Sequence, residues 1–177
     1  MSENRGKKFE RVIREAFEKV PGVSIDRLHD QTNGFKGSQN ICDFIVYKEP
    51  YEYYFECKSV HGRTLSIHSI PHTGKDGKVC GFYGNITDKQ WGGLLEKSKI
   101  PGVFAGIICW WVDKDITRFI PIQTLYRMYH AGVKSVNCYW DIYTDVHLNP
   151  YHLPEIKGKK KRVFFEYSME DFFTHFE

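Results

Sequence analysis

The stretch that most constrains the fold is residues 43–58, D-F-I-V-Y-K-E-P-Y-E-Y-Y-F-E-C-K. Two apolar runs flank Glu49-Pro50-Tyr51, a pattern that predicts two antiparallel strands joined by a tight turn. Such a hairpin brings Asp43, at the start of the first strand, level with Glu56 near the end of the second. Side chains two residues apart in a strand share a face, so Glu56 and Lys58 project together. The sequence therefore predicts two carboxylates and one ammonium at one edge of a sheet.

This trio suits metal-dependent phosphodiester hydrolysis. Mg²⁺ prefers oxygen ligands and usually takes one or two carboxylates. A bound metal lowers the pKa of a water molecule and neutralises charge on the phosphate, while Lys58 would orient that water and stabilise the developing negative charge. The alternative is an ordinary hairpin with a surface ion pair, since acid-x-Lys is common in strands. The upstream Asp43, the adjoining apolar runs and a Gly-rich polar loop before Asp43 favour the nuclease.

Composition bounds the class of protein. A chain of 177 residues can form one domain with a hydrophobic core, and no linker or repeat divides it, so we expect a single domain over residues 1–177. The net charge of +3 permits nucleic-acid binding without requiring it. No apolar run approaches the ~20 residues that span a membrane, and the first twenty residues do not resemble a signal peptide. Five cysteines without a C-x-x-C pair are typical of free thiols in a reducing compartment, so we expect a cytoplasmic protein.

Hydrophobic periodicity predicts an α/β fold in which a mixed central sheet is flanked by helices. The run at 103–112 is apolar throughout and indicates a central strand buried on both faces. Three phenylalanines near the C-terminus are expected to complete the core or a dimer interface: Phe172, Phe173 and Phe176. The helices are predicted at 4–19, 86–99 and 122–130 (Leu125, Met128 and Tyr129 inward), and the other strands at 23–29, 117–120 and 163–167.

Residues 60–85 read as an insertion that is mostly loop. A weak alternation at 64–70 could continue a strand, and 71–84 is rich in glycine and lysine and is expected to be a loop. The side chains of His61, His68, His72 and Cys80 raise the alternative of a zinc site, but their spacing matches no closed structural site. A segment that contacts DNA, Lys75 included, is the favoured interpretation.

Basic and polar residues in three places suit a phosphate backbone: the outer face of the first helix, the loop before Asp43, and the run at 156–162. Each has a plainer alternative, a solvated helix face or an ordinary loop. The residues predicted to bind DNA are Arg5, Lys7, Lys8, Arg11, Lys36, Ser38, Lys75, Lys159 and Lys160.

Three further positions allow two interpretations. Glu10 could reach the metal site or pair with Arg14 one helical turn away. Gln90 could assist the site or form a capping box with Thr87 at the start of its helix. The two aspartates of Asp113-Lys114-Asp115 are interpreted as turn formers rather than as a second metal site.

Taken in order, the motifs resemble the PD-(D/E)xK nuclease superfamily and, within it, the RecU-type Holliday junction resolvases and their phage-borne relatives. The resemblance covers roughly residues 4–140. It departs from the usual pattern in a longer segment between Lys58 and Gln90 and in lacking a Pro before Asp43. The motifs are Asn4-Arg5-Gly6-Lys7-Lys8-Phe9-Glu10, Asp43, Glu56-Cys57-Lys58, Gln90, the strand at 103–111 and Ile120-Pro121-Ile122.

The resemblance implies a restriction-endonuclease-like core and a homodimer that cleaves branched double-stranded DNA, the four-way junction, in recombination and repair. It implies Mg²⁺, for which Mn²⁺ can substitute, and a bacterial or phage-infected host cell. The metal ligands would be Glu10, Asp43, Glu56 and the Cys57 carbonyl, and Lys58 and Gln90 would complete a catalytic set with Asp43 and Glu56. Two alternatives remain open: a restriction-like or nicking endonuclease on other DNA structures, and a non-catalytic DNA-binding module of the same fold.

Overall fold

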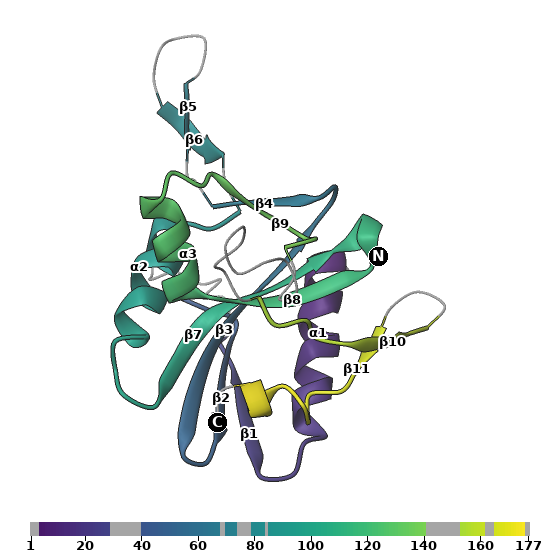
Figure 1. Ribbon diagram of the computed structural model, residues 1–177. Helices are drawn as coiled ribbons and strands as arrows, with labels where there is room; N and C mark the ends of the chain where they lie inside the picture. Colours follow the sequence, from purple (N-terminus) through teal and green to yellow (C-terminus); the bar gives the residue numbers. More distant parts are fainter. Residues whose placement is uncertain are drawn as a thin grey trace, which may run out of the picture.

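The computed structural model describes residues 4–28, 40–67, 70–73, 79–83, 85–140, 153–161 and 165–175. A five-stranded sheet with the strand order β1-β2-β3-β7-β8 lies at its centre (Figure 1). β3 and β7 are parallel and the other neighbours are antiparallel, which confirms the predicted mixed sheet. The strands are β1 (Val23–Arg27), β2 (Phe44–Lys48), β3 (Tyr51–Val60), β7 (Val103–Trp111) and β8 (Ile116–Pro121).

The β2–β3 hairpin forms where the sequence predicts it. Its register pairs Lys48 with Tyr51 beside the turn and Phe44 with Phe55 at the far end. Both phenylalanines are fully buried. Their burial specifies the register, because a one-residue slip would turn every inward side chain of the strand to the opposite face. The register ends with this pair, and the residues directly beyond it, Asp43 and Glu56, belong to the candidate site.

β7 is the buried central strand. Residues 105–111 are all buried, as expected of a strand covered on both faces. Gly106 is needed there, because a Cβ at this position would press against the Ile120 carbonyl oxygen and lie 2.7 Å from the Phe119 ring. The close approach of β8 to β7 thus depends on a residue without a side chain.

Helices cover both faces of the sheet (Figure 1). α1 (Arg5–Glu18) buries Phe9 and Ile13 in one core with the inward side chains of β2 and β3. On the other face, α2 (Asp88–Lys97) and α3 (Ile122–His130) form a second core with β7. No helix of the described part is long and apolar enough to cross a membrane.

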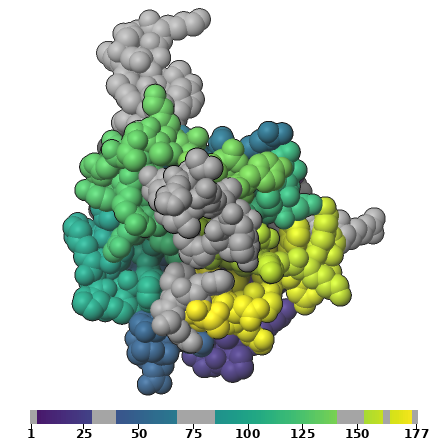
Figure 2. Space-filling model, viewed as in Figure 1, coloured from purple at the N-terminus to yellow at the C-terminus, as the bar shows by residue number. Residues whose placement is uncertain are grey.

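The C-terminal segment completes the core on the α1 side. The Phe173 ring lies 5.2 Å from that of Tyr53, and the Phe172 ring lies 5.7 Å from that of Phe17. Both phenylalanines are buried, and in Figure 2 this yellow segment lies beside the purple N-terminal part of the chain. The core alternative is therefore confirmed for these two, while Phe176 lies outside the described residues.

The prediction of a loop over 71–84 is wrong. β5 (Ile70–Thr73) and β6 (Val79–Tyr83) form an antiparallel hairpin that projects from the body at the top of Figure 1. Short segments with apolar residues lie on either side of the glycine- and lysine-rich stretch and favour strands. The polar stretch between them made the whole region resemble a loop in the sequence. Two more short pairs are β4 (Thr64–Ser66) with β9 (Ser135–Asn137) and β10 (Gly158–Lys160) with β11 (Phe165–Tyr167).

α3 corrects one inward residue. Leu125 and Met128 are fully buried as predicted, but Tyr129 is 44% exposed. Its ring lies 5.7 Å from the Trp91 ring of α2. At about 100° per residue Tyr129 lies on the same side of α3 as Ile122 and Leu125, so its exposure follows from its place in the last turn, which ends at His130.

Candidate active site

Asp43 lies beside Glu56 at the end of the hairpin. Its N–H donates to the Phe55 carbonyl at 2.9 Å, directly beyond the last β2–β3 pair, that of Phe44 with Phe55. The Asp43 carboxylate in turn accepts from the Cys57 N–H at Oδ2, 2.7 Å away. The Cys57 side chain lies in the core on the α1 side, as predicted. The predicted alignment of the two acids is therefore present.

Glu56 is 4% exposed and is held by two donors. Lys58 Nζ lies 2.7 Å from Glu56 Oε1, and Gln90 Nε2 donates to the same oxygen at 2.5 Å. Among the residues that the structure describes, none bonds Oε2. Within the described part of the chain, one oxygen of Glu56 is thus fixed by two donors and the other has no hydrogen bond.

Burial raises the pKa of both acids, and neighbouring carboxylates add to the effect. Burial and the neighbouring Glu56 raise the pKa of Asp43 to about 8, although the hydrogen bond from the Cys57 N–H acts in the opposite direction and lowers it. Burial also raises the pKa of Glu56, and the Lys58 ammonium and the Gln90 amide offset part of that effect. The pair is therefore short of positive charge, and a bound cation would relieve it.

The donor set fits a hard divalent cation in part. Mg²⁺ usually takes one or two carboxylates and keeps several waters, and Asp43 and Glu56 supply two. In a strand the N–H and C=O of one residue face the same neighbour, so the Cys57 carbonyl faces the side of Asp43, beyond the last β2 pair. Within the described ranges, however, no three His, Cys, Asp or Glu side chains gather as a ready metal site.

Glu10 is the acid that stays apart. Its carboxylate accepts from Arg27 Nη2 at 3.0 Å, whereas Arg14 pairs with Glu18 instead. The alternative of a Glu10–Arg14 pair is therefore wrong. The negative charge of Glu10 also raises the pKa of Asp43 and of Glu56, and its contribution is smaller than that of burial. Arg27 was not among the predicted site residues, although it ends β1 and pairs with Phe44, next to Asp43.

Gln90 satisfies both of its predicted interpretations. Thr87 caps α2, its hydroxyl accepting from the Gln90 N–H, while the Gln90 side-chain oxygen accepts from the Thr87 N–H. The amide nitrogen of the same side chain is the group that reaches Glu56. The helix cap thereby aims this amide at the site.

The predicted DNA-binding residues are spread over the surface. Arg5 contacts His61, Arg11 pairs with Glu15, and Lys160 pairs with Asp115. Exposed positions are also held by Lys7 and Lys159, and Lys8 lies one position further along α1. The others fall outside the described residues: Lys36, Ser38 and Lys75.

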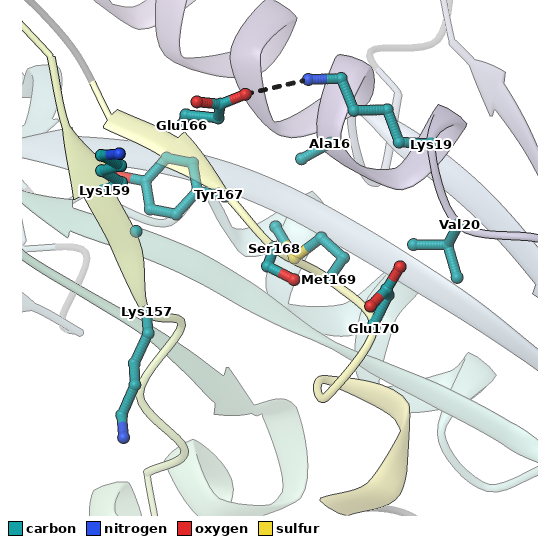
Figure 3. A pocket seen from close by; sticks show the side chains of 11 residues that line it. Ala16, Lys19, Val20, Lys157, Lys159, Glu166, Tyr167, Ser168, Met169 and Glu170 are labelled. Atoms are coloured by element: carbon teal, nitrogen blue, oxygen red, sulfur yellow. Dashed lines mark ion pairs between the residues drawn. The ribbon is translucent and has the colours of Figure 1, made fainter.

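A groove of about 510 Å³ runs between the C-terminal end of α1 and the β10–β11 pair (Figure 3). Lys157 and Lys159 line one side, and on the other Lys19 lies 3.6 Å from Glu166. The groove lies on the α1 side of the molecule, whereas Glu56 and Lys58 share their strand face with residues of the α2–α3 core. It is a mixed-charge surface rather than part of the acid pair.

The zinc alternative gains no support from the described side chains. His61 bonds Asp113 and Arg5, and the side chains of the other three residues of that prediction are not described. Asp113 and Asp115 do lie in a turn, as predicted, and Asp115 has a left-handed φ of 53°. The contacts of Asp113 with His61 and with the Gly62 N–H were not foreseen, since no local spacing connects these segments.

No protein-family model and no curated protein matches the chain. A solved structure that is similar to it is that of Hjc, a Holliday junction resolvase from the archaeal hyperthermophile Archaeoglobus fulgidus. The identity is 18%, the TM-score is 0.45, and the match covers 67% of this chain and 78% of that chain. At this identity and TM-score the similarity by itself assigns no function to the chain.

Proposed function

We propose that this protein is a divalent-metal-dependent endodeoxyribonuclease that cleaves branched double-stranded DNA, with the four-way Holliday junction as substrate. It would act in recombination and repair in the cytoplasm of a bacterium or phage-infected cell. The observation that carries the proposal is that Asp43, directly before the first residue of β2, accepts from the Cys57 N–H next to Glu56, whose carboxylate pairs with Lys58. The resemblance of the ordered motifs to RecU-type resolvases and a restriction-endonuclease-like core supplies the substrate class.

Mg²⁺, for which Mn²⁺ can substitute, would be held by Asp43, Glu56 and the Cys57 carbonyl. Glu10 would join them on release from Arg27. When bound, such an ion lowers the pKa of a water molecule and neutralises charge on the phosphate. The raised pKa values of the two buried acids, caused first by burial and then by neighbouring carboxylates, support this assignment because a cation lowers the cost of keeping both ionised.

The chain's own residues preorganise the reaction. The Cys57 N–H fixes the Asp43 carboxylate, and Gln90 fixes Glu56. Lys58 is 22% exposed at its side chain, so its ammonium can reach a phosphate while it stays beside the acid. It would orient the attacking water and stabilise the charge that develops on the phosphate.

A resolvase has to make two symmetric cuts. One chain carries one such acid pair, so two cuts require two sites, and the active form would be a two-fold symmetric homodimer. Gel filtration with and without junction DNA tests this part. A monomer under both conditions would contradict it.

Cleavage of a synthetic mobile four-way junction and of a matched linear duplex tests the function. The reactions contain Mg²⁺, Mn²⁺ or EDTA, and the proteins are wild type, Asp43→Asn, Glu56→Gln and Lys58→Ala. We expect paired nicks in the junction, none in EDTA, and a loss of about 10²–10³-fold or more in each variant. The matched control is Glu96→Gln, which alters an exposed acid that pairs with Lys99.

The other results would redirect the proposal. Equal cutting of the linear duplex would favour a restriction-like or nicking endonuclease on other DNA structures. Tight junction binding without cutting in either metal would leave a non-catalytic DNA-binding module. Unchanged cutting by Asp43→Asn would place the site elsewhere.

A further inference from the structure

Three segments meet beside the N-terminus of α1 and are joined there by hydrogen bonds. Arg5 Nη1 lies 2.6 Å from His61 Nε2. The other ring nitrogen of His61, Nδ1, lies 2.9 Å from Asp113 Oδ1, and the Gly62 N–H donates to Asp113 Oδ2 at 2.7 Å. The segments are the start of α1, the turn after β3 and the turn after β7, which converge at the N label in Figure 1.

The chemistry of the three groups gives the chain of hydrogen bonds a direction. A guanidinium can only donate, so His61 Nε2 accepts from Arg5. The imidazole proton then resides on Nδ1 and is donated to Asp113. Asp113, itself fixed by the Gly62 N–H, orients the ring, and the ring orients Arg5. The remaining N–H groups of the guanidinium are left for another acceptor.

The Arg5–His61–Asp113 relay, as we call this chain of hydrogen bonds, lies close to Lys58 along the sequence at His61. His61 follows Lys58 by three residues, which in an extended chain is about 10 Å. Successive phosphates of one DNA strand advance by about 3.4 Å along the helix axis. Arg5 is therefore bonded to a residue that lies at most about 10 Å along the chain from Lys58, a span of about three phosphates.

We infer that His61 and Asp113 are positioning residues that hold Arg5 ready to bind a backbone phosphate of the DNA beside the scissile one. The inference rests on the proposed function, because it takes the anion to be a DNA phosphate. An arginine that is already ordered loses less side-chain freedom on binding, which corresponds to about 2- to 10-fold in affinity.

Removal of the Asp113 carboxylate is expected to change the DNA affinity in the direction opposite to the usual one. Removing an acid near a DNA-binding surface ordinarily strengthens binding, since one repulsion is lost. If Asp113 acts by holding His61 and Arg5, its removal weakens binding instead. A turn-forming aspartate without this role would follow the ordinary rule.

The test is the binding of a fluorescently labelled four-way junction to the full chain in EDTA, by anisotropy, between about 50 and 200 mM salt. Arg5→Ala is expected to weaken binding and to reduce the salt slope by about 1. His61→Ala and Asp113→Ala are expected to weaken binding about 2- to 10-fold. Glu96→Ala and Lys99→Ala, an exposed pair at the far end of α2, are the matched charge controls and should leave affinity unchanged.

The double variants separate positioning from a general structural effect. In an Arg5→Ala background, His61→Ala and Asp113→Ala should have no further effect, because they act through Arg5. His61→Gln, whose side chain can still accept from Arg5, should recover part of the loss. In Mg²⁺, Arg5 and His61 variants should raise KM with little change in kcat.

Three outcomes would overturn the inference: stronger binding by Asp113→Ala, losses that add to that of Arg5→Ala, or no junction binding by the parent chain. Failure of the proposed nuclease is read separately, from cleavage. A parent chain that binds with the expected coupling but cuts nothing in Mg²⁺ or Mn²⁺ would refute the nuclease and leave the Arg5 contact standing.

Discussion

Gln90 bonds Glu56 with the same side chain that closes the cap of α2. Its nitrogen donates to Glu56 Oε1 at 2.5 Å while its oxygen accepts from the Thr87 N–H at 3.1 Å. An amide side chain can donate to a carboxylate through its nitrogen and accept from a backbone N–H through its oxygen at once. One side chain therefore links the N-terminus of α2 to Glu56 through two hydrogen bonds.

This dual contact predicts that Gln90→Glu keeps the cap of α2 but impairs the site. Glutamate at this position also serves a capping box and favours the helix N-terminus. Its carboxylate would repel Glu56, so cleavage should fall about tenfold or more, and the melting temperature should fall through that repulsion and not through the cap. Thr87→Ala is the comparison, since it should cost about 1 kcal/mol of stability through the lost cap. Equal activity in Gln90→Glu and wild type would show that the amide plays no part in the site.

Two Gly→Ala substitutions should have opposite effects on the free energy of unfolding. A Cβ at Gly106 would meet the Ile120 carbonyl and the Phe119 ring, so Gly106→Ala should destabilise by about 1–3 kcal/mol. A Cβ at Gly92, inside α2, meets nothing within 4 Å. Gly92→Ala should therefore stabilise by about 0.5–1 kcal/mol. Urea denaturation measures both, and a stabilising Gly106→Ala would contradict the close packing of β8 on β7.

The sequence was sufficient for the site where the contacts are local. Asp43 and Glu56 lie 13 positions apart on one hairpin, and alternation plus a turn determines which residues meet. The same holds for the buried β7 and for the cap at Thr87. These features depend on periods of two and 3.6 residues that a single sequence displays.

Contacts between distant elements could not be predicted in this way. The Glu10–Arg27 pair and the Arg5–His61–Asp113 relay join segments whose relative placement depends on how α1 packs over the whole sheet. No local spacing encodes that placement. The β5–β6 hairpin was missed for a different reason, since a polar, glycine-rich stretch outweighed the short apolar segments beside it.

The acid pair should make the protein less stable as pH rises. The pKa of Asp43 is raised from 3.8 to about 8 by burial and by Glu56, so between these values the folded chain holds a proton that the unfolded chain has released. The stabilising contribution is present below about pH 4 and lost as pH rises through 8. Asp43→Asn cannot ionise and should flatten this dependence.

Thermal unfolding in EDTA from pH 4 to about 8 measures this dependence. Asp43→Asn should match wild type at the acid end and exceed it by several degrees at the alkaline end, since about 1 kcal/mol corresponds to about 2–4 °C in a domain of this size. Parallel curves for the two proteins would contradict the raised pKa of Asp43. Glu96→Gln, at an exposed position, should behave as wild type throughout.

Arg27 should set how strongly the site binds a metal ion. Its guanidinium neutralises Glu10 and places a positive charge next to the acid pair. Arg27→Gln removes that charge and releases Glu10, so half-saturation should occur at about 3- to 10-fold lower Mg²⁺ concentration, which corresponds to about 1 kcal/mol. Glu10→Gln should shift it the other way.

The rise in melting temperature on Mg²⁺ addition reports binding without any need for cleavage, because a ligand that binds only the folded state stabilises it by RT ln(1 + [L]/Kd). The shift should vanish in Asp43→Asn and shrink towards pH 5, where protonated carboxylates no longer bind the ion. If Arg27→Gln bound Mg²⁺ no better than wild type, Glu10 would not belong to the metal site, and the two hairpin carboxylates would have to hold the ion with water alone.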